Sequence, residues 1–207
     1  MIKELLDKPY ESRVSSGKFS ISSVNSCWKK KYQTMKGIFR EEYEETTKRI
    51  FSIGDIYHRE IVAELIVKGE SNGLHLIASE FNISHPFLSG RIDAVLSDGK
   101  DMIILDVKSA GKYTMDKIRQ GECPENYKNQ IMLYMHITGI HRGILLFVGK
   151  EKGTLEEQEV TYDKEKCDKL IAEIKDFMEN NVAKDIEPEE KCDGLPFGCP
   201  VCSWSKK

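Results

Sequence analysis

The sequence carries little net charge and has no long apolar run. It contains 31 Lys and Arg residues against 34 Asp and Glu residues, which gives a formal net charge of −3. Because a protein that coats nucleic acid through charge alone is strongly basic, this balance excludes that class but allows a local basic groove. The longest nearly uncharged apolar stretch, residues 131–140, is too short to cross a bilayer. We therefore expect no membrane-spanning helix.

The first residues also lack the apolar segment of a secretory signal, since Met1 to Lys8 is charged. We therefore expect a cytoplasmic protein. A hydrophobic content of 40% over 207 residues is ordinary for one globular domain, which disfavours disorder, collagen and coiled coil. The cytoplasm keeps thiols reduced, so the 6 cysteines are more typical of a metal site or catalysis than of disulfides.

The cysteines divide into a group of four and two isolated residues. Four thiolates can bind either zinc or an iron–sulfur cluster. Cys167 falls on an apolar helical stripe and is expected in the core, whereas Cys123 has no partner nearby. The candidate metal ligands are Cys27 near the N-terminus and Cys192, Cys199 and Cys202 near the C-terminus.

A basic segment with interleaved aromatic residues follows Cys27. Such a segment can line a path for phosphates and stack bases, but a solvated helix face explains the charge about as well. The candidate DNA-binding residues are Lys29, Lys30, Lys31 and Tyr32.

The hydrophobic pattern changes between helical and strand periodicity along the chain, which favours an α/β fold with a central mixed sheet flanked by helices. Asp98-Gly99 is a hairpin signal, and Gly139 is typical of a helix end. The expected helices cover residues 20 or 22 to 35 with Cys27 near the middle, 47–68, 124–138 and a segment from Asp163, and the expected strands cover 76–83, 88–96, 102–108, 143–148 and 155–162.

The third strand ends in a carboxylate and a lysine. Asp106 and Lys108 are two residues apart and share a face of the strand, about 6 to 7 Å apart at the backbone. If Asp98-Gly99 forms a two-residue turn, Asp93 faces Ile104 and lies diagonal to Asp106. A three-residue loop would place Asp93 on the opposite face.

Two neighbouring carboxylates can hold Mg²⁺ or Mn²⁺, because these ions take oxygen ligands from carboxylates, water and phosphate. A lysine beside them can stabilise charge that develops on a phosphate. A buried ion pair between Asp106 and Lys108 is the alternative interpretation of the same residues.

Four short motifs together resemble a known nuclease family. The strings Gly90-Arg91-Ile92-Asp93 and Asp106-x-Lys108 resemble the PD-(D/E)XK nuclease core. The strings Gly54-x-x-x-His58 and Gln130-x-x-x-Tyr134 are similar to the helix motif and the glutamine–tyrosine motif of its RecB-like branch. The motifs occur in the order of that family, and the resemblance implies its restriction-endonuclease-like core.

The resemblance also implies roles for these residues. His58, Asp93 and Asp106, with the Val107 carbonyl, would hold Mg²⁺ or Mn²⁺ for the attack of water on a phosphodiester. Lys108 would assist that attack, while Gln130 and Tyr134 would position the DNA strand or Lys108. Asp106 stands where glutamate is commoner in the family, a change that keeps the charge.

The cysteine pattern resembles the iron–sulfur RecB-like nucleases, among them the CRISPR-associated exonuclease of the Cas-four type. In that family four cysteines hold a [4Fe–4S] cluster that clasps the two chain ends. Here the longer gap between tail cysteines comes first, which departs from the family order and keeps zinc as an alternative. The implied single domain comprises an N-terminal helical part (1–46), a nuclease core (47–182) and a cysteine-rich clasp (183–207).

The resemblance implies a metal-dependent DNA exonuclease, acting on single-stranded DNA in the 5′→3′ direction, in CRISPR adaptation or in phage or host recombination. The second hypothesis is a weakly active or inactive DNA-binding scaffold, a partner of the CRISPR integrase. The third is a zinc-stapled structural protein with incidental ion pairs. The sequence leaves the oligomeric state open.

Overall fold

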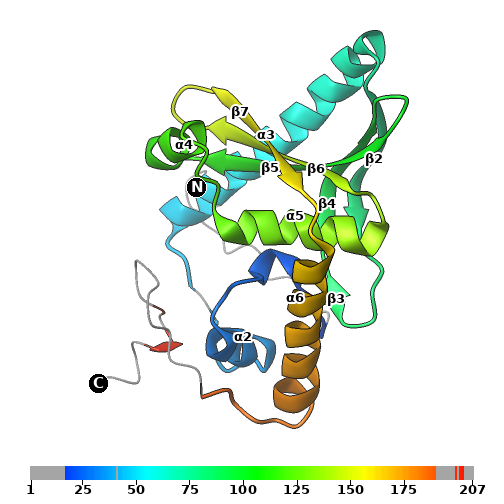
Figure 1. The fold of residues 1–207 in the computed structure, drawn as a ribbon. Helices are drawn as coiled ribbons and strands as arrows, with labels where there is room; N and C mark the ends of the chain where they lie inside the picture. The colour runs from blue at the N-terminus through cyan, green and yellow to red at the C-terminus, as the bar shows by residue number, and fades with distance from the viewer. Residues whose placement is uncertain (1–16, 41, 190–198, 200, 203–207) are drawn as a thin grey trace.

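The computed structural model describes residues 17–40, 42–189, 199 and 201–202 (Figure 1). Its main sheet has five strands in the order β2-β4-β5-β6-β7, and β1 pairs with β3 in a separate parallel ribbon. The strands are β1 Phe19–Ser20, β2 His75–Asn82, β3 Leu88–Ser89, β4 Arg91–Ser97, β5 Met102–Ala110, β6 Arg142–Gly149 and β7 Leu155–Thr161. The helical segments are η1 Ile21–Ser23, α2 Trp28–Met35, α3 Glu45–Gly69, η2 Glu70–Asn72, α4 Lys112–Arg119, α5 Glu125–Thr138, α6 Lys164–Asp176 and η3 Phe177–Val182.

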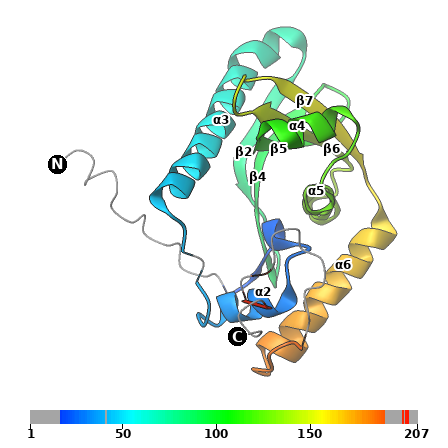
Figure 2. The same ribbon diagram turned by 90° about the vertical axis from the view of Figure 1, so that its left-hand side faces the viewer.

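The main sheet is mixed, because β5 and β6 run parallel whereas its other pairs are antiparallel. Helices α3 and α5 cover its opposite faces (Figure 2). On β5, Ile104 packs into the cluster that includes α5, whereas Leu105 and Val107 pack into the cluster that includes α3. The expected α/β architecture with a mixed sheet flanked by helices is therefore confirmed.

The β4–β5 hairpin differs from the expected two-residue turn. Its register pairs Ser97 with Met102, so the loop contains the four residues 98–101. Asp98 stabilises this longer loop, because its Oδ1 accepts the backbone N–H groups of Lys100 and Asp101 at 3.0 and 2.8 Å.

The parity is the same as for a two-residue turn, and the register continued beyond Ala94 would bring Asp93 opposite Asp106 rather than Ile104. The strand alternation breaks there, however, because Ile92 and Val95 both pack on the α5 side and Asp93 contacts His58 of α3. The expectation that Asp93 and Asp106 share one face is therefore wrong, although the two residues lie close together.

Two other expected elements are wrong in detail. The helix before Met35 begins at Trp28, and Cys27 is its N-cap rather than a mid-helix residue. The expected strand 88–96 is interrupted at Gly90, which separates β3 from β4.

Helix boundaries elsewhere follow ordinary capping rules. Gly139 ends α5 with a φ of 73°, and the Asp163 side chain caps α6 by accepting the N–H of Lys166. Helix α4 was not expected, although Met115 and Ile118 are buried one turn apart on it. Among the described residues, no helix is both long and apolar enough to cross a membrane.

Candidate active site

The backbone ladder of the β4–β5 hairpin ends before the two strands do, on the side away from the 98–101 loop. Their ladder stops at Ala94 and Leu105, and the side chain of Asp93 takes over the next backbone donor, accepting the Val107 N–H at Oδ2 over 2.8 Å. This side-chain bond satisfies a donor that the ladder no longer serves. At this point the candidate site receives side chains from both faces of the sheet, because His58 of α3 contacts Asp93 and Gln130 of α5 contacts Asp106.

Helix α3 contributes His58 from one face. Its Nδ1 lies 3.3 Å from Asp93 Oδ2. Gly54, one turn earlier, is buried, and a Cβ there would lie 3.0 Å from the Ser109 Oγ. As expected from the motif, the missing side chain lets α3 approach β5 closely enough for His58 to reach the site.

Helix α5 contributes Gln130 and Tyr134 from the other face. The Gln130 Nε2 donates to Asp106 Oδ1 at 3.2 Å, and its Oε1 accepts from Lys108 Nζ at 3.2 Å. The same Nε2 lies 3.3 Å from the Tyr134 hydroxyl. The amide therefore orients both members of the Asp106–Lys108 pair, which the helical spacing of the two residues allows.

Asp106 and Lys108 form a buried ion pair. Asp106 is 1% exposed, and its Oδ2 lies 2.6 Å from the Lys108 Nζ. Carboxylate oxygens are the ligands that Mg²⁺ and Mn²⁺ prefer, so Asp106 remains a candidate metal ligand.

The ionisable groups of the site change one another's pKa values. Burial raises the pKa of Asp106, and the nearby Asp93 adds to this, although Lys108 opposes it. Burial also disfavours the charged form of Lys108, but the charge of Asp106 outweighs this and raises its pKa. Lys108 is therefore a cation at neutral pH.

Asp93 and His58 stabilise each other's charged forms. Burial opposes the ionisation of Asp93, yet the hydrogen bond and charge of His58 lower its pKa overall. The same contact raises the pKa of His58 against the effect of its own burial. Metal binding by His58 would require the neutral form of its imidazole.

The structure brings together the six predicted side chains His58, Asp93, Asp106, Lys108, Gln130 and Tyr134, with Val107 between two of them. Oxygen and imidazole ligands of this kind suit Mg²⁺ or Mn²⁺. His58, Asp93 and Asp106 could hold such an ion together with the Val107 main chain.

The sequence interpretation assigned no structural role to Gly90 itself. A Cβ at Gly90 would lie 2.7 Å from Cε1 and 3.1 Å from the hydroxyl of Tyr134, so a side chain here would displace that ring. The Tyr134 hydroxyl also accepts the backbone N–H of Arg91. The sequence feature that could have predicted this packing role is a glycine within an expected strand, since such a glycine often marks the close approach of another chain segment.

We expect Gly90→Ala to destabilise the fold by about 1 to 3 kcal/mol, because Tyr134 is fully buried and cannot move aside. Displacement of Tyr134 should also disturb Gln130 and lower any cleavage rate. Thermal unfolding and cleavage assays measure both effects. Gly111→Ala is the matched control, since its Cβ would lie at an ordinary van der Waals distance, 3.7 Å, from its nearest neighbour, the Glu151 Oε1. Equal stability of the two variants would contradict the proposed packing role of Gly90.

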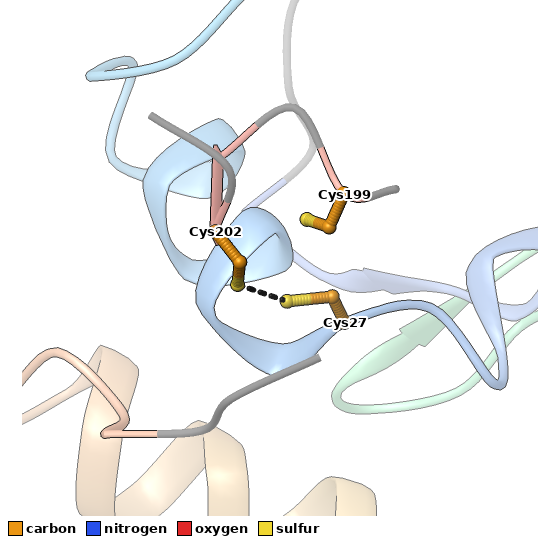
Figure 3. A group of neighbouring side chains, drawn as sticks. All are labelled: Cys27, Cys199 and Cys202. Atoms are coloured by element: carbon orange, nitrogen blue, oxygen red, sulfur yellow. Dashed lines mark hydrogen bonds between the residues drawn. The ribbon is translucent and has the colours of Figure 1, made fainter. Parts of the chain in front are cut away.

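Three cysteines meet where α2 begins. Cys27, Cys199 and Cys202 have sulfur atoms that all lie within 4.8 Å of one another, and Figure 3 shows them pointing toward a common centre. The Cys27 Sγ is 3.6 Å from that of Cys202 and accepts the Lys30 N–H at 3.4 Å. A helix N-terminus favours a thiolate at this position. The fourth predicted ligand, Cys192, lies outside the described residues.

The basic segment on α2 makes contacts within the protein. Lys29 pairs with Glu187 at 3.2 Å, and the Tyr32 hydroxyl donates to Asp185 at 2.9 Å. Lys31 lies over the Phe19 ring, and burial, with a smaller contribution from Lys30, lowers its pKa to about 8. The predicted DNA-binding role of Lys29, Lys30, Lys31 and Tyr32 stays a prediction.

Comparison with known proteins identifies a family. Residues 10–206 match the family described as PD-(D/E)XK nuclease superfamily. A search of curated protein sequences finds no match.

Several solved structures share this fold. The alkaline exonuclease LHK-Exo from Laribacter hongkongensis is 15% identical, with a TM-score of 0.62 over 83% of this chain and 90% of that chain. A phage-related exonuclease from Haemophilus somnus is 14% identical, with a TM-score of 0.57 over 81% and 96% of the two chains. The protein SSO0001 is 16% identical, with a TM-score of 0.54 over 99% and 92%. At these identities the similarity shows the fold alone.

Proposed function

The chain belongs to the PD-(D/E)XK nuclease superfamily, and from this premise we propose that it is a divalent-metal-dependent exonuclease that degrades single-stranded DNA in the 5′→3′ direction. The observation that carries the proposal is the meeting of His58 from α3, Asp93 from β4 and the Asp106–Lys108 pair from β5: Asp93 Oδ2 lies 3.3 Å from His58, and Asp106 Oδ2 lies 2.6 Å from Lys108. An incidental ion pair between Asp106 and Lys108 would not require a second carboxylate and an imidazole beside it, whereas a metal-dependent nuclease site uses such groups as ligands.

The reaction is hydrolysis of a phosphodiester. Water adds to phosphorus, one P–O ester bond breaks, and the products carry a phosphomonoester and a hydroxyl group. A bound Mg²⁺ or Mn²⁺ supplies Lewis-acid polarisation of the phosphate and lowers the pKa of water. His58, Asp93, Asp106 and the Val107 main chain are the proposed ligands.

Lys108 acts in this proposal as a fixed positive charge. Its raised pKa keeps it protonated at neutral pH, so it stabilises negative charge on the phosphate rather than accepting a proton. Gln130 holds the Nζ of Lys108 and the Oδ1 of Asp106 in one network. Tyr134 supports that amide from the next turn of α5.

The direction and the strand preference rest on the resemblance to the Cas-four type of exonuclease, and two of the similar folds are themselves named exonucleases. A second structure of LHK-Exo, in complex with dAMP, is 18% identical with a TM-score of 0.57 over 83% and 90% of the two chains. That nucleotide has the chemistry of an exonuclease product.

The test uses single-stranded DNA labelled at the 5′ or the 3′ end, together with circular single-stranded DNA and linear duplex, in Mg²⁺ or Mn²⁺. We expect early release of the 5′ label, slower loss of duplex and no cleavage of circles. Equal cleavage of circles would contradict exonuclease action. DNA binding without cleavage of any substrate would favour the scaffold hypothesis.

The cellular role that we propose is trimming of DNA ends in CRISPR adaptation or in recombination of phage or host DNA. In the first case, the protein should bind a purified CRISPR integrase complex and trim the DNA that it carries. In the second, it should degrade one strand at the ends of recombining DNA. Reconstitution with the integrase separates these roles.

We propose that Cys27, Cys199 and Cys202, with Cys192, bind a [4Fe–4S] cluster, as the family resemblance implies. Zinc is the second candidate, because thiolates about 2.3 Å from a tetrahedral ion lie about 3.8 Å apart, near the 3.6 Å between the sulfurs of Cys27 and Cys202. Anaerobic purification with metal analysis decides between them. A brown preparation containing iron supports the cluster, and a colourless one with stoichiometric zinc supports the zinc site.

A further inference from the structure

A cavity of about 380 Å³ opens beside the candidate metal ligands, between α3 and the edge strand β2. Its size lies at the lower end of the range for small-molecule sites and is too small for a DNA duplex. Two residues of the candidate active site, His58 of α3 and Asp93 of β4, belong to its lining. The lining residues are His58, Arg59, Val62, Ala63, Ile66, Ser79, Glu80 and Asp93.

The lining combines an apolar surface with hydrogen-bond donors and acceptors. Val62, Ala63 and Ile66 come from consecutive turns of α3, and Ile66 is 55% exposed. Arg59 offers donors, and Glu80 offers an acceptor. A nucleobase has the matching character, because its faces are apolar and its edge carries donors and acceptors.

The cavity begins at the reaction centre and extends away from it along α3. His58 and Ile66 are eight residues apart, about 12 Å along the helix axis. A nucleoside seated in this space would therefore lie next to a phosphate held at Asp93. The β2 strand of its wall is an edge strand of the main sheet.

The backbone of the β2 wall departs from regular strand geometry at the cavity. Glu80 has a φ of 50°, which is rare for a residue with a side chain. The register pairs Ser79 with Ala94 and Phe81 with Ile92, so Glu80 and Asp93 occupy the intervening positions on the two strands. Glu80 pairs with Arg91 at 3.1 Å. Such departures concentrate at functional sites, where the surrounding structure maintains them.

We propose that this cavity receives the nucleoside at the end of the DNA strand, so that each hydrolytic step releases one mononucleotide. The inference rests on the proposed nuclease function and adds a binding site for the terminal base and sugar. The α3 wall contacts the base through Val62, Ala63 and Ile66, and Arg59 and Glu80 contact its polar edge.

The test is to fill the cavity and measure nucleotide binding and product size. Ala63→Trp places an indole on the cavity wall. We expect it to weaken the binding of dAMP, dCMP, dGMP and dTMP at least tenfold by calorimetry in EDTA, and to lower mononucleotide release from linear single-stranded DNA similarly. Ala63→Leu fills less space and should have an intermediate effect.

Glu64→Trp is the matched control, because Glu64 neighbours Ala63 in sequence but lies outside the cavity lining. Its contact with Lys68 is an ion pair of two exposed side chains, so its loss should be tolerated. Thermal unfolding of all three variants shows that each is folded.

The outcomes separate the two proposals. If the wild-type protein binds no mononucleotide, or if Ala63→Trp binds and cleaves as the wild type does, the cavity proposal is wrong while the nuclease function stands. If the wild type cleaves no DNA in Mg²⁺ or Mn²⁺, the nuclease proposal fails. The binding measurement in EDTA then still decides whether the cavity takes a nucleotide.

Discussion

Lys108→Ala is expected to lower DNA cleavage by about 100- to 1000-fold, the loss typical of removing one preorganised group that stabilises transition-state charge. The Nζ of Lys108 lies 2.6 Å from Asp106 Oδ2 and 3.2 Å from Gln130 Oε1, so two contacts hold its charge in place. Initial rates on labelled single-stranded DNA in Mn²⁺ measure the effect.

The same substitution should destabilise the protein in a pH-dependent way. It leaves the Asp106 carboxylate buried without its cation, and removing one partner of a buried pair costs about 3 kcal/mol at neutral pH. Burial already raises the pKa of Asp106, and the loss of Lys108 raises it further. A carboxyl group whose pKa is raised in the folded state destabilises the protein as the pH rises through that pKa. The difference in unfolding free energy between Lys108→Ala and the wild type should therefore shrink as the pH falls toward 4.

Chemical denaturation at several pH values measures this trend. Lys117→Ala is the matched control, because Lys117 is a half-exposed lysine of α4 that lies outside the site. A stability loss in Lys108→Ala that is independent of pH would contradict the assignment of Asp106 as the unpaired charge. Unchanged cleavage would contradict the role of Lys108.

Cys27→Ser is expected to remove the bound metal and lower the stability by at least about 2 kcal/mol, since metal binding to a structural cysteine site contributes directly to folding. The substitution replaces only the sulfur atom by oxygen, so it tests the thiolate alone. Serine is a good helix N-cap, so the start of α2 should keep its capping bond. Metal analysis and thermal unfolding give the two measurements.

Cys123→Ser is the control for this variant, because the half-buried Cys123 lies apart from the three clustered cysteines. It should retain the full metal content. If Cys27→Ser also retains its metal and its stability, the cysteine group is not a metal site. The nuclease assay on the same samples shows whether the active site depends on this metal.

The proximity of the candidate site residues on β4 and β5 could be predicted because the hairpin brings the two strands together. The four-residue loop shifted the register by two residues, which keeps the parity of the pairing. The alternation then breaks at Asp93, which reaches His58 on α3 while Asp106 contacts Gln130 on α5. The spacing of Gln130 and Tyr134 predicted a shared helix face, and the two side chains do contact each other.

The details that could not be predicted depend on tertiary contacts. Nothing local indicates that β4 and β5 separate after Ala94 and Leu105, because the Asp93 side chain replaces the lost backbone bond only in the folded sheet. The start of α2 at Cys27 was also missed. Cysteine is not a typical N-cap residue, although the Cys27 sulfur accepts the Lys30 N–H here.

The cluster of Cys27, Cys199 and Cys202 joins the two ends of the chain, so it can form only late in protein synthesis. Cys27 and Cys202 are 175 positions apart in the chain, and the entire nuclease sheet lies between them. A ribosome must therefore release almost the whole protein before these cysteines can meet. If the proposed metal binds there, we expect it to join the two ends of the chain only after all the strands of the sheet have been synthesised.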